Sequence, residues 1–534
     1  MAPQALAIAS VAVAIITYLQ ALDFPFVSDD SYYVAENYRL AALHWNELWR
    51  LFAQPYNPYD FLPLRDMSYW LDITLFGLNP MAFRLHNILL YALCCLLVYA
   101  ATRSWWRCFR PAEEASAPWV AAIVTALFAI HPAHVEAAVW ISSRKDVLAG
   151  MFAMLALWLA ANVKRERMFS TAYATATLLA LLAAMLSKAT AVAVAPIITI
   201  LWILLWRDIP STFRHRALML WPTAPLLLAA GVAPMFMANA TLRLPAYFGI
   251  EAIPRSLAVL GSLTRLAISP ESRHFIYPVI DDSWRWGLVA LGVAVLVGAF
   301  AGVWMLLRRR SIEGFALIAF ALLCMPYTQL APYFTNSLVT DRFLFLALWP
   351  VALLIVALVW RLSPVPRAII LLVITLPWVF QSIERPRDWS SYEALIDHDF
   401  NAYPGHYPLA YQRIVRFQLP NRQFSAARAT ASNIDVPEAR DIMIKLVDAA
   451  SAMQVAAASG DPREAIYRLR ALEPLFRKPP VQAQWDPPML HFWKESRGSF
   501  VLEWRWLENN FSDDASVRYN AELSLRSIRE SAAY

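Results

Sequence analysis

The sequence predicts an all-α polytopic membrane protein that ends in a separate helical domain. Of its 534 residues, 59% are hydrophobic and only 16% are charged, and the mean hydropathy is +0.44. Soluble globular domains carry more charge than this. Long apolar runs follow one another up to residue 383, after which hydropathy falls and charge rises. This change indicates a membrane domain followed by a water-exposed tail.

Eleven apolar runs are the expected transmembrane helices, because each is about long enough to cross a hydrocarbon core of roughly 30 Å. They lie at residues 4–22, 85–104, 116–132, 146–163, 171–187, 190–206, 217–237, 286–307, 314–332, 343–360 and 368–383. The segment 256–269 is also apolar, but it is short and contains Arg265. We expect it to dip into the outer leaflet without crossing the membrane.

Basic residues mark every second loop between these spans. They are Arg103, Arg107, Arg110, Lys164, Arg165, Arg167, Arg207, Arg214, Arg216, Arg308, Arg309, Arg310, Arg361 and Arg367. Short loops rich in Lys and Arg remain on the cytoplasmic side. We therefore expect an integral membrane protein with a cytoplasmic N-terminus and an extracytoplasmic C-terminus, in the inner membrane if the protein is bacterial.

This topology places two large segments outside the cytoplasm. The first is the loop 23–84 of a transmembrane domain that covers residues 1–383, and the second is the tail, residues 384–534. The stretch LHWNELWRLF in the loop predicts an amphipathic helix at the membrane surface. Residues 437–476 of the tail predict two antiparallel helices broken at 460–462, as in tetratricopeptide repeats. A small irregular helical domain is the alternative.

Charged and polar side chains gather at the span ends on the predicted outer side. The group comprises Asp29, Asp30, Arg65, Asp66, His131, His134, Glu136, Arg144, Lys145, Asp146, Lys188, Asp341 and Arg342. A charge at mid-membrane costs about 2.5–3.5 kcal/mol on insertion scales, so charges gathered on one side are informative. Two adjacent carboxylates and several cations suit a phosphate-bearing lipid donor and a hydroxyl acceptor that meet at the outer leaflet.

Each of these residues also has a structural interpretation. The adjacent acids are consistent with solvated loop charges, Lys188 with a snorkelling side chain, and His131 and His134 with helix caps. No metal site is expected, because the proline in HPAH breaks the helix that an HExxH site needs and no cysteines have zinc spacing. The net charge of +6 is distributed among loops between apolar runs, so no nucleic-acid partner is expected.

Five blocks, in order along the chain, resemble a known enzyme class. They are FVSDDSYYVAEN, LPLRDMSYWLDITLFGLNPMAFRLHNILL, LFAIHPAHVEAAVWISSRKDVLAGMFAMLAL, MLSKATAVAVAP and DRFLFL. Together they resemble the GT-C membrane glycosyltransferases, and most of all the tetratricopeptide-containing protein O-mannosyltransferases and their bacterial relatives. The chain departs from the family pattern at Leu62, Arg84, Ala189 and Asp341, so the sugar and the acceptor cannot be copied across.

The resemblance implies a GT-C-like fold and an inverting transfer of sugar from a polyprenyl-phosphate donor to an acceptor hydroxyl. Asp29 or Asp30 would act as the base, and Arg144, Lys145, Lys188, Arg342 and Arg65 would bind the donor phosphate. His131, His134, Glu136, Asp66, Asp146 and Asp341 are further candidates. A phosphate monoester is a good leaving group, so no metal cofactor is expected.

The acceptor expected from the tail is a Ser or Thr hydroxyl of an envelope or secreted protein. A glycosyltransferase acting on a lipid or polysaccharide is one alternative, and a flippase for lipid-linked sugars is another. Transporters place their charges near the bilayer midplane and show inverted repeats, whereas these charges cluster at one face. A non-catalytic scaffold is the third alternative.

Overall fold

The described part of the chain folds into helices. The computed structural model describes residues 2–57, 60–162, 171–205, 252–269, 273–277, 285–328, 330, 337–479 and 487–530, and these residues include no strand. The helices up to residue 205 are α1 (Pro3–Leu19), η1 (Ser31–Ala35), α2 (Tyr38–Ala41), η2 (Trp45–Phe52), α3 (Pro63–Phe76), α4 (Pro80–Phe109), η3 (Pro111–Ser116), α5 (Ala117–Ala129), α6 (His134–Val139), η4 (Ile141–Ser143), α7 (Arg144–Asn162), α8 (Thr171–Ser187), η5 (Ala189–Ala193) and α9 (Val194–Leu205).

The helices after residue 251 form the rest of the bundle and the tail. They are α12 (Ala252–Ile268), α13 (Arg285–Arg309), α14 (Ile312–Cys324), η7 (Met325–Tyr327), η8 (Asp341–Leu344), α15 (Leu348–Val359), α16 (Pro364–Glu384), η9 (Arg385–Ser390), α17 (Tyr392–Ala402), α18 (Tyr407–Arg413), η10 (Ile414–Gln418), α19 (Phe424–Ser432), α20 (Pro437–Ser459), α21 (Arg463–Arg477), α22 (Pro487–Asn510) and α23 (Ala515–Glu530).

Local sequence signals start several of the long helices. The side chain of Asn79 accepts a hydrogen bond from the backbone of Met81, and Pro80 occupies the first turn of α4. Ser311 caps α14 in the same way, since its hydroxyl accepts from the backbone N–H of Gly314 at 3.2 Å. Caps of this kind satisfy backbone donors that have no partner in the first helical turn.

The centre of the bundle is held by buried aromatic rings from helices that are distant in sequence. The Trp105 ring of α4 stacks on the Phe315 ring of α14, with 4.5 Å between centroids. Its edge-to-face contact with Trp349 of α15 has a centroid distance of 5.7 Å. All three side chains are buried, so this aromatic cluster joins the early and late helices of the bundle.

Two glycines let α12 and α13 pack with their backbones in contact. A Cβ atom on Gly261 would lie 1.9 Å from the carbonyl oxygen of Leu288, and one on Gly292 would lie 2.1 Å from that of Leu257. Any side chain at either position would force the helices apart. The segment expected to dip into the membrane is therefore a helix attached to α13, and its depth in the bilayer stays a prediction.

Ten of the eleven expected spans coincide with helices, and the span 217–237 lies outside the described residues. Among the described residues, five helices are long and apolar enough to cross a membrane. They are Pro80–Phe109, Ile141–Asn162, Trp286–Arg309, Pro364–Ser390 and Pro437–Ser459. The last of these is α20, which packs against α19, α21 and α22 in the tail. The chain is thus an all-helical membrane protein, and the count of eleven spans stays a prediction.

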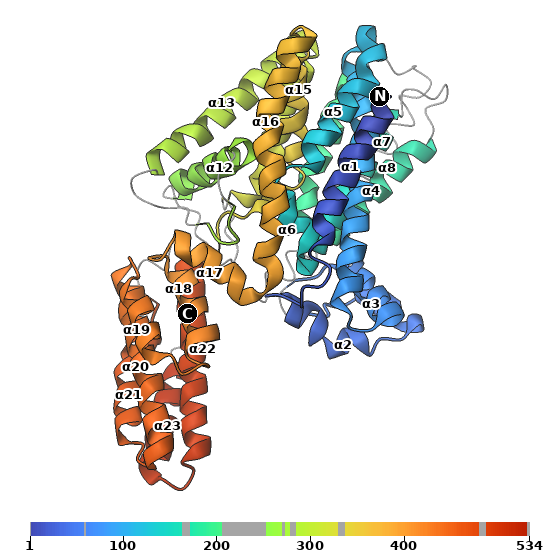
Figure 1. Ribbon diagram of the computed structural model, residues 1–534. Coiled ribbons are helices and arrows are strands. Elements are labelled where there is room, and N and C mark those ends of the chain that lie inside the picture. The colour runs from blue at the N-terminus through green and yellow to red at the C-terminus, as the bar shows by residue number, and fades with distance from the viewer. Residues whose placement is uncertain are drawn as a thin grey trace.

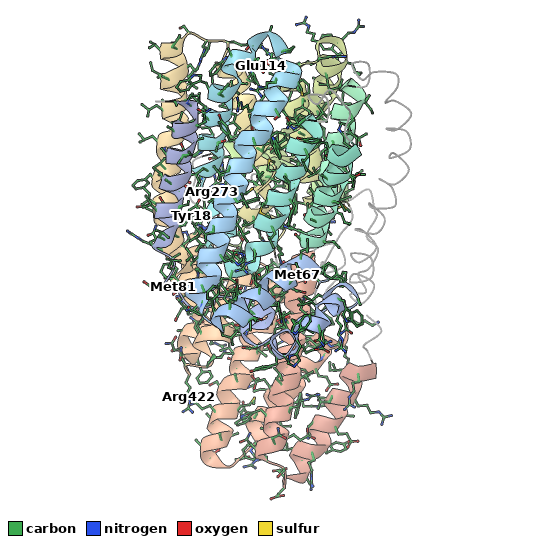
Figure 2. The ribbon with its side chains drawn as sticks, turned by 90° about the vertical axis from the view of Figure 1, so that its right-hand side faces the viewer. Tyr18, Met67, Met81, Glu114, Arg273 and Arg422 are labelled. Atoms are coloured by element: carbon green, nitrogen blue, oxygen red, sulfur yellow. The ribbon has the colours of Figure 1, made fainter. Side chains whose placement is uncertain are left out.

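The first loop and the tail lie at the same end of the bundle, as the charge pattern predicts (Figure 1). Figure 2 shows Glu114 at the opposite end from Arg422, with Met67 of the loop between bundle and tail. In the loop, η2 is a 3₁₀ helix that leaves the side chains of Trp45 and Trp49 78% and 64% exposed. Exposed tryptophans suit a membrane surface, although which side of the membrane this end faces stays a prediction.

The tail is built from helical hairpins. The expected break falls between α20 and α21, where Gly460 ends α20 at a φ of 74°. Glycine adopts this left-handed conformation without the steric cost that a Cβ would bring. Ala449 and Ala456 of α20 are buried, and such small side chains allow close packing of helices. The hairpin is confirmed, while its kinship with tetratricopeptide repeats and the domain boundary at residue 384 stay predictions.

Candidate functional site

A sharp turn after α1 carries the two adjacent carboxylates. Ser28 has a φ of 55°, a left-handed conformation that non-glycine residues rarely adopt and that is often found at functional sites. The turn leads into a π-helical segment, η1, that begins at Ser31. Asp30 becomes fully buried, whereas Asp29 stays half-buried. The two neighbours therefore have different surroundings.

Asp30 ties the first loop to the segment before α7. Its Oδ2 accepts from the backbone of Val27 at 2.9 Å, and its Oδ1 accepts from the backbone N–H and the hydroxyl of Ser142. Burial raises the pKa of Asp30 to about 6, and the hydrogen bonds from Ser142 and Val27 oppose this rise. Both oxygens are engaged with the protein, which suits a positioning role better than proton abstraction.

Asp29 faces cations instead. Its Oδ1 accepts a hydrogen bond from the Ser28 hydroxyl at 3.3 Å. Burial lowers the pKa of Arg342, but Glu136 and Asp146 raise it more, and the charge of Asp29 adds to this rise. Asp29 also attracts the ammonium of Lys145. Asp29 is therefore a half-buried carboxylate beside positive charge.

Arg342 is held in place by Glu136. The backbone N–H of Arg342 donates to Glu136 Oε2 at 2.9 Å, and its guanidinium pairs with Glu136 Oε1. The guanidinium also lies 5.1 Å from the centroid of the Trp140 ring. Burial raises the pKa of Glu136 to about 7, although Arg342 opposes this rise. Two oxygens of one fully buried acid thus fix an arginine that is 15% exposed.

Lys188 and Lys145 complete the group of cations. Lys188 pairs with Asp146 at 2.5 Å and lies 5.0 Å from the Tyr327 ring centroid, and the Asp146 charge raises its pKa. Lys145 is half-buried, with its ammonium 5.0 Å from the Tyr33 ring centroid. Within the described residues Lys145 has neither an ion pair nor a hydrogen bond for this ammonium, so its donors remain available to a ligand.

Arg65 belongs to an internal network of the first loop. Its guanidinium donates to both oxygens of Asp60, at 2.9 and 2.8 Å, and to Asp66 at 2.9 and 2.6 Å. Burial raises the pKa of Asp66 to about 6. Arg65 is fully buried and paired with two acids, so the geometry favours a structural role over the phosphate binding expected from the sequence.

Arg144, like Arg65, is buried and pairs with an acid of the protein. It pairs with Asp72 at 2.5 Å and donates to Asn87 at 2.6 Å and to the carbonyl of Phe83 at 2.8 Å. Its side chain is fully buried and joins α3, α4 and α7. All three of these acceptors belong to the protein, so this arginine too is better suited to holding helices together than to binding a phosphate.

The histidine pair does not form a shared site. His131 contacts the carbonyl of Ala267 through Nε2 at 3.3 Å and accepts from the backbone of Ala133 through Nδ1. His134 lies among aromatic rings, with the Phe128 centroid at 4.2 Å, and neither of its ring nitrogens has a partner in the described part of the chain. Burial lowers the pKa of His134 to about 3. These features indicate core residues.

The carboxylate of Asp341 contacts Tyr277 and Arg273, which do not belong to the group of Lys145, Lys188 and Arg342. Tyr277 donates to Asp341 Oδ1 at 2.9 Å, and Arg273 lies 3.4 Å from the same oxygen. The cations that Asp29 acts on are therefore Lys145 and Arg342. Lys188 lies close enough to Arg342 to interact with it electrostatically, and Asp146 and Glu136 hold Lys188 and Arg342 in place.

Four contributors were not expected from the sequence. Asp60, Asp72 and Asn87 bind the buried arginines Arg65 and Arg144. Tyr392 of the tail approaches the acidic turn, where the Tyr392 hydroxyl interacts with Ser28. Burial raises the pKa of Tyr392, and the charge of Asp29 raises it further. Asp72 and Asn87 lie inside the second of the five sequence blocks that resemble the glycosyltransferases. That resemblance was the signal that could have identified them. No signal in the sequence connected Tyr392 to residues more than 350 positions earlier.

The arrangement can perform one kind of chemistry well. A half-buried carboxylate can accept a proton from an alcohol, and cations beside it can stabilise negative charge on a phosphate. The first loop, which carries Asp29 and follows α1, lies at the end of the bundle where the tail begins (Figure 1).

Comparison with known proteins gives a sequence relationship over part of the chain. No family model matches. The chain is 31% identical over 148 residues to protein O-mannosyl-transferase TMTC1 of Homo sapiens, which covers 26% of this chain and 16% of that protein. It is 31% identical over 155 residues to protein O-mannosyl-transferase TMTC2 of Mus musculus, covering 28% of this chain and 18% of that protein. The resemblance found in the sequence is thereby confirmed, and the matches span less than a fifth of these relatives' own length.

Two solved structures are distantly similar. The Archaeoglobus fulgidus oligosaccharyltransferase, in complex with Zn and sulfate, aligns with a TM-score of 0.40 and 14% identity, over 72% of this chain and 53% of that one. ArnT from Cupriavidus metallidurans, bound to undecaprenyl phosphate, aligns with a TM-score of 0.36 and 15% identity, over 92% of this chain and 77% of that one.

Proposed function

From the relationship to protein O-mannosyl-transferases, we propose that the chain is an inverting glycosyltransferase that uses a polyprenyl-phosphate-linked sugar. The observation that carries the proposal is the half-buried Asp29 beside Lys145 and Arg342, with Lys188 near Arg342. A base and a phosphate-binding group are the two parts that such a transfer needs.

The reaction requires one base and one departing phosphate. Asp29 takes the proton of the acceptor hydroxyl, while the hydroxyl oxygen attacks the anomeric carbon from the side opposite the phosphate. The bond between that carbon and the phosphate oxygen breaks, and its electron pair leaves with the polyprenyl phosphate. The anomeric configuration is inverted. A well-placed base accelerates such a step by about 10²–10⁴-fold.

The three cations contribute differently to phosphate binding. Lys188 and Arg342 are oriented by Asp146 and Glu136, which also neutralise part of their charge. Lys145 has no such ion pair in the described residues, although Asp60, Asp146 and Asp29 act on it electrostatically, so the donors of its ammonium are available to a ligand. Charge-assisted hydrogen bonds to a phosphate are stronger than neutral ones. Lys145 is therefore the residue whose loss should weaken donor binding most cleanly.

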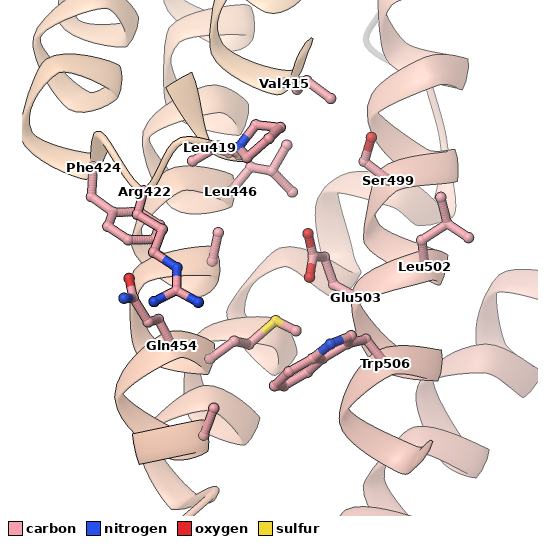
Figure 3. A pocket seen from close by; sticks show the side chains of 14 residues that line it. Val415, Leu419, Arg422, Phe424, Leu446, Gln454, Ser499, Leu502, Glu503 and Trp506 are labelled. Carbon is pink, nitrogen blue, oxygen red and sulfur yellow. The ribbon is translucent and has the colours of Figure 1, made fainter. Parts of the chain in front are cut away.

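The tail offers a groove for an acceptor polypeptide. A cavity of about 420 Å³ lies between η10, α20 and α22, where Arg422 and Gln454 face Glu503 and Trp506 (Figure 3). A second cavity of about 720 Å³ adjoins it, because Val415, Ser499 and Leu502 line both. The two form one groove with apolar walls and scattered charges, a lining that suits an extended peptide.

The groove approaches the acidic turn. Arg416 and Glu495 line its second cavity, and both act electrostatically on Tyr392, whose hydroxyl interacts with Ser28 beside Asp29. A polypeptide in the groove would thus have a route toward the base. This continuity supports a Ser or Thr hydroxyl of an envelope or secreted protein as the acceptor.

Donor turnover tests the central proposal. We expect purified protein to release polyprenyl phosphate from synthetic polyprenyl-phosphate mannose, used as the probe. Lys145→Gln should raise the KM for this donor by about 10–100-fold, since a hydrogen bond to a charged group contributes about 1.5–3 kcal/mol. Lys445→Gln, an exposed lysine of the tail, is the control. Equal KM values in the two variants would remove Lys145 from the donor site, and no turnover of any lipid-linked sugar would overturn the proposal.

A matched pair of variants tests the acceptor groove. Leu502 lines the groove and is 65% exposed, whereas Val455 is 61% exposed and lies outside the lining residues. In cells, Leu502→Glu should reduce O-glycosylation of envelope proteins seen by mass spectrometry, while Val455→Glu should not. If envelope polysaccharide or lipid loses sugar instead, the acceptor is not a protein.

A further inference from the structure

We propose that His274, His398 and Asp399 form a binding site for a divalent transition-metal ion of the zinc type. The three residues each offer a ligand atom, and these atoms all lie within 4.8 Å of one another. His274 comes from the connection after α12, and the other two come from α17. The metal would fasten the first helix of the tail to the membrane domain, a role separate from glycosyl transfer.

The spacing of two ligand atoms fits a tetrahedral site. His274 Nδ1 lies 3.3 Å from Asp399 Oδ1. Zinc binds histidine nitrogen and carboxylate oxygen at about 2.0–2.2 Å, so neighbouring ligand atoms of a tetrahedron lie roughly 3.3–3.5 Å apart. Two histidines and one carboxylate are a common ligand set, with water in the fourth position.

Surrounding groups orient the proposed ligands. Asp399 Oδ2 accepts hydrogen bonds from the backbone of Phe275 and Ile276, both at 2.8 Å, which leaves Oδ1 directed to His274. His398 Nε2 lies 3.2 Å from the carbonyl of Arg273, and its Nδ1 lies 3.6 Å from Asp388. Outer hydrogen bonds to ligating histidines and carboxylates are a regular feature of metal sites.

The burial of the three side chains, and their access to solvent, also suit a metal site. His274 and Asp399 are buried, whereas the side chain of His398 is 37% exposed and gives the ion a route from solvent. His131 and His134, where the sequence predicted no metal site, differ in access, because both are buried and His134 lies among Phe128, Tyr91 and Phe345. Tertiary structure has therefore placed the metal ligands on segments more than 120 residues apart.

The side chain of Phe275 lies between the proposed metal site and Arg342, one of the proposed donor cations. Phe275, whose backbone binds Asp399, packs against Trp140 and Trp389 with centroid distances of 5.4 Å to each. Arg342 lies 6.0 Å from the Phe275 ring centroid. A metal that fixes this segment would hold Phe275 against the tryptophans, and with it the docking of α17.

Metal analysis of the full chain tests the proposal. The protein is purified with a tag that lacks histidine, stripped with EDTA, and loaded with Zn²⁺ or Co²⁺ alone. We expect one tightly bound ion per chain, a visible Co²⁺ absorption typical of four-coordinate nitrogen and oxygen ligands, and a higher thermal midpoint with Zn²⁺.

Three variants decide the location of the ion. His398→Ala and Asp399→Asn should each weaken Zn²⁺ binding by at least about 100-fold, since even outer-sphere changes cost 10–100-fold. Asp397→Asn, an exposed acid on the same helix, should bind as the unmodified chain does. The proposal is overturned if the unmodified chain binds no zinc, or if His398→Ala binds it with unchanged affinity.

Discussion

Exchanging Asp29 for Asn removes one negative charge from beside Lys145 and Arg342 and leaves a side chain of the same size. Asp29 is half-buried, and its described hydrogen bond comes from the Ser28 hydroxyl, which an amide oxygen also accepts. Folding should therefore be little changed. Turnover should fall by about 10²–10⁴-fold, because the amide cannot take a proton from the acceptor.

The neighbouring exchange, Asp30→Asn, should behave differently. Three donors point at the Asp30 carboxylate, one from Val27 and two from Ser142. An amide has only one oxygen, so its NH₂ group must face an N–H donor on one side. An unsatisfied buried donor costs about 1–3 kcal/mol, so this variant should lose thermal stability and show a milder loss of turnover.

The assay is the release of polyprenyl phosphate from synthetic polyprenyl-phosphate mannose in the presence of envelope proteins, together with a thermal midpoint for each variant. We expect opposite patterns, with a kinetic loss for Asp29→Asn and a stability loss for Asp30→Asn. Near-normal turnover in Asp29→Asn would refute the role of Asp29 as base. A collapse of turnover in Asp30→Asn with an unchanged midpoint would transfer that role to Asp30.

Three further outcomes follow from the same contacts. Arg144→Ala should reduce the yield of folded protein more than it changes donor KM, because it breaks a buried ion pair and leaves the Asp72 carboxylate with only His86 beside it in the described part of the chain. Breaking a buried pair costs about 3–5 kcal/mol. Burial raises the pKa of Glu136 to about 7, so Glu136 gains a proton as the pH falls through 7 and its ion pair with Arg342 is lost. Donor KM should then rise below pH 7, and Glu136→Gln should show a high KM without this pH step. In a background without the native cysteines, a membrane-impermeant thiol reagent applied from outside should label Arg422→Cys but not Glu114→Cys, and the reverse pattern would invert the topology.

The sequence proposed the candidate acids and cations as one group at the span ends on one side, and their roles in the site stay predictions. The structure brings Lys145 and Arg342 near Asp29, with Lys188 near Arg342. Arg144 came from the same kind of position, yet it is fully buried and pairs with Asp72. A charge at a span end has the same appearance in sequence whether it faces a ligand or an internal acid, so position alone could not distinguish them.

The sequence by itself determined the helices, the expected side of the membrane for each loop, and the relationship to membrane glycosyltransferases. These properties are encoded locally, since apolar length sets a span, basic loops set orientation, and the Gly460 turn sets a hairpin. Only the tertiary structure decided which charges are paired and which remain available. Asp30 and Ser142 are 112 residues apart, and Arg342 and Glu136 are 206 apart. Such contacts depend on how whole helices pack, and no local pattern in the chain encodes that packing.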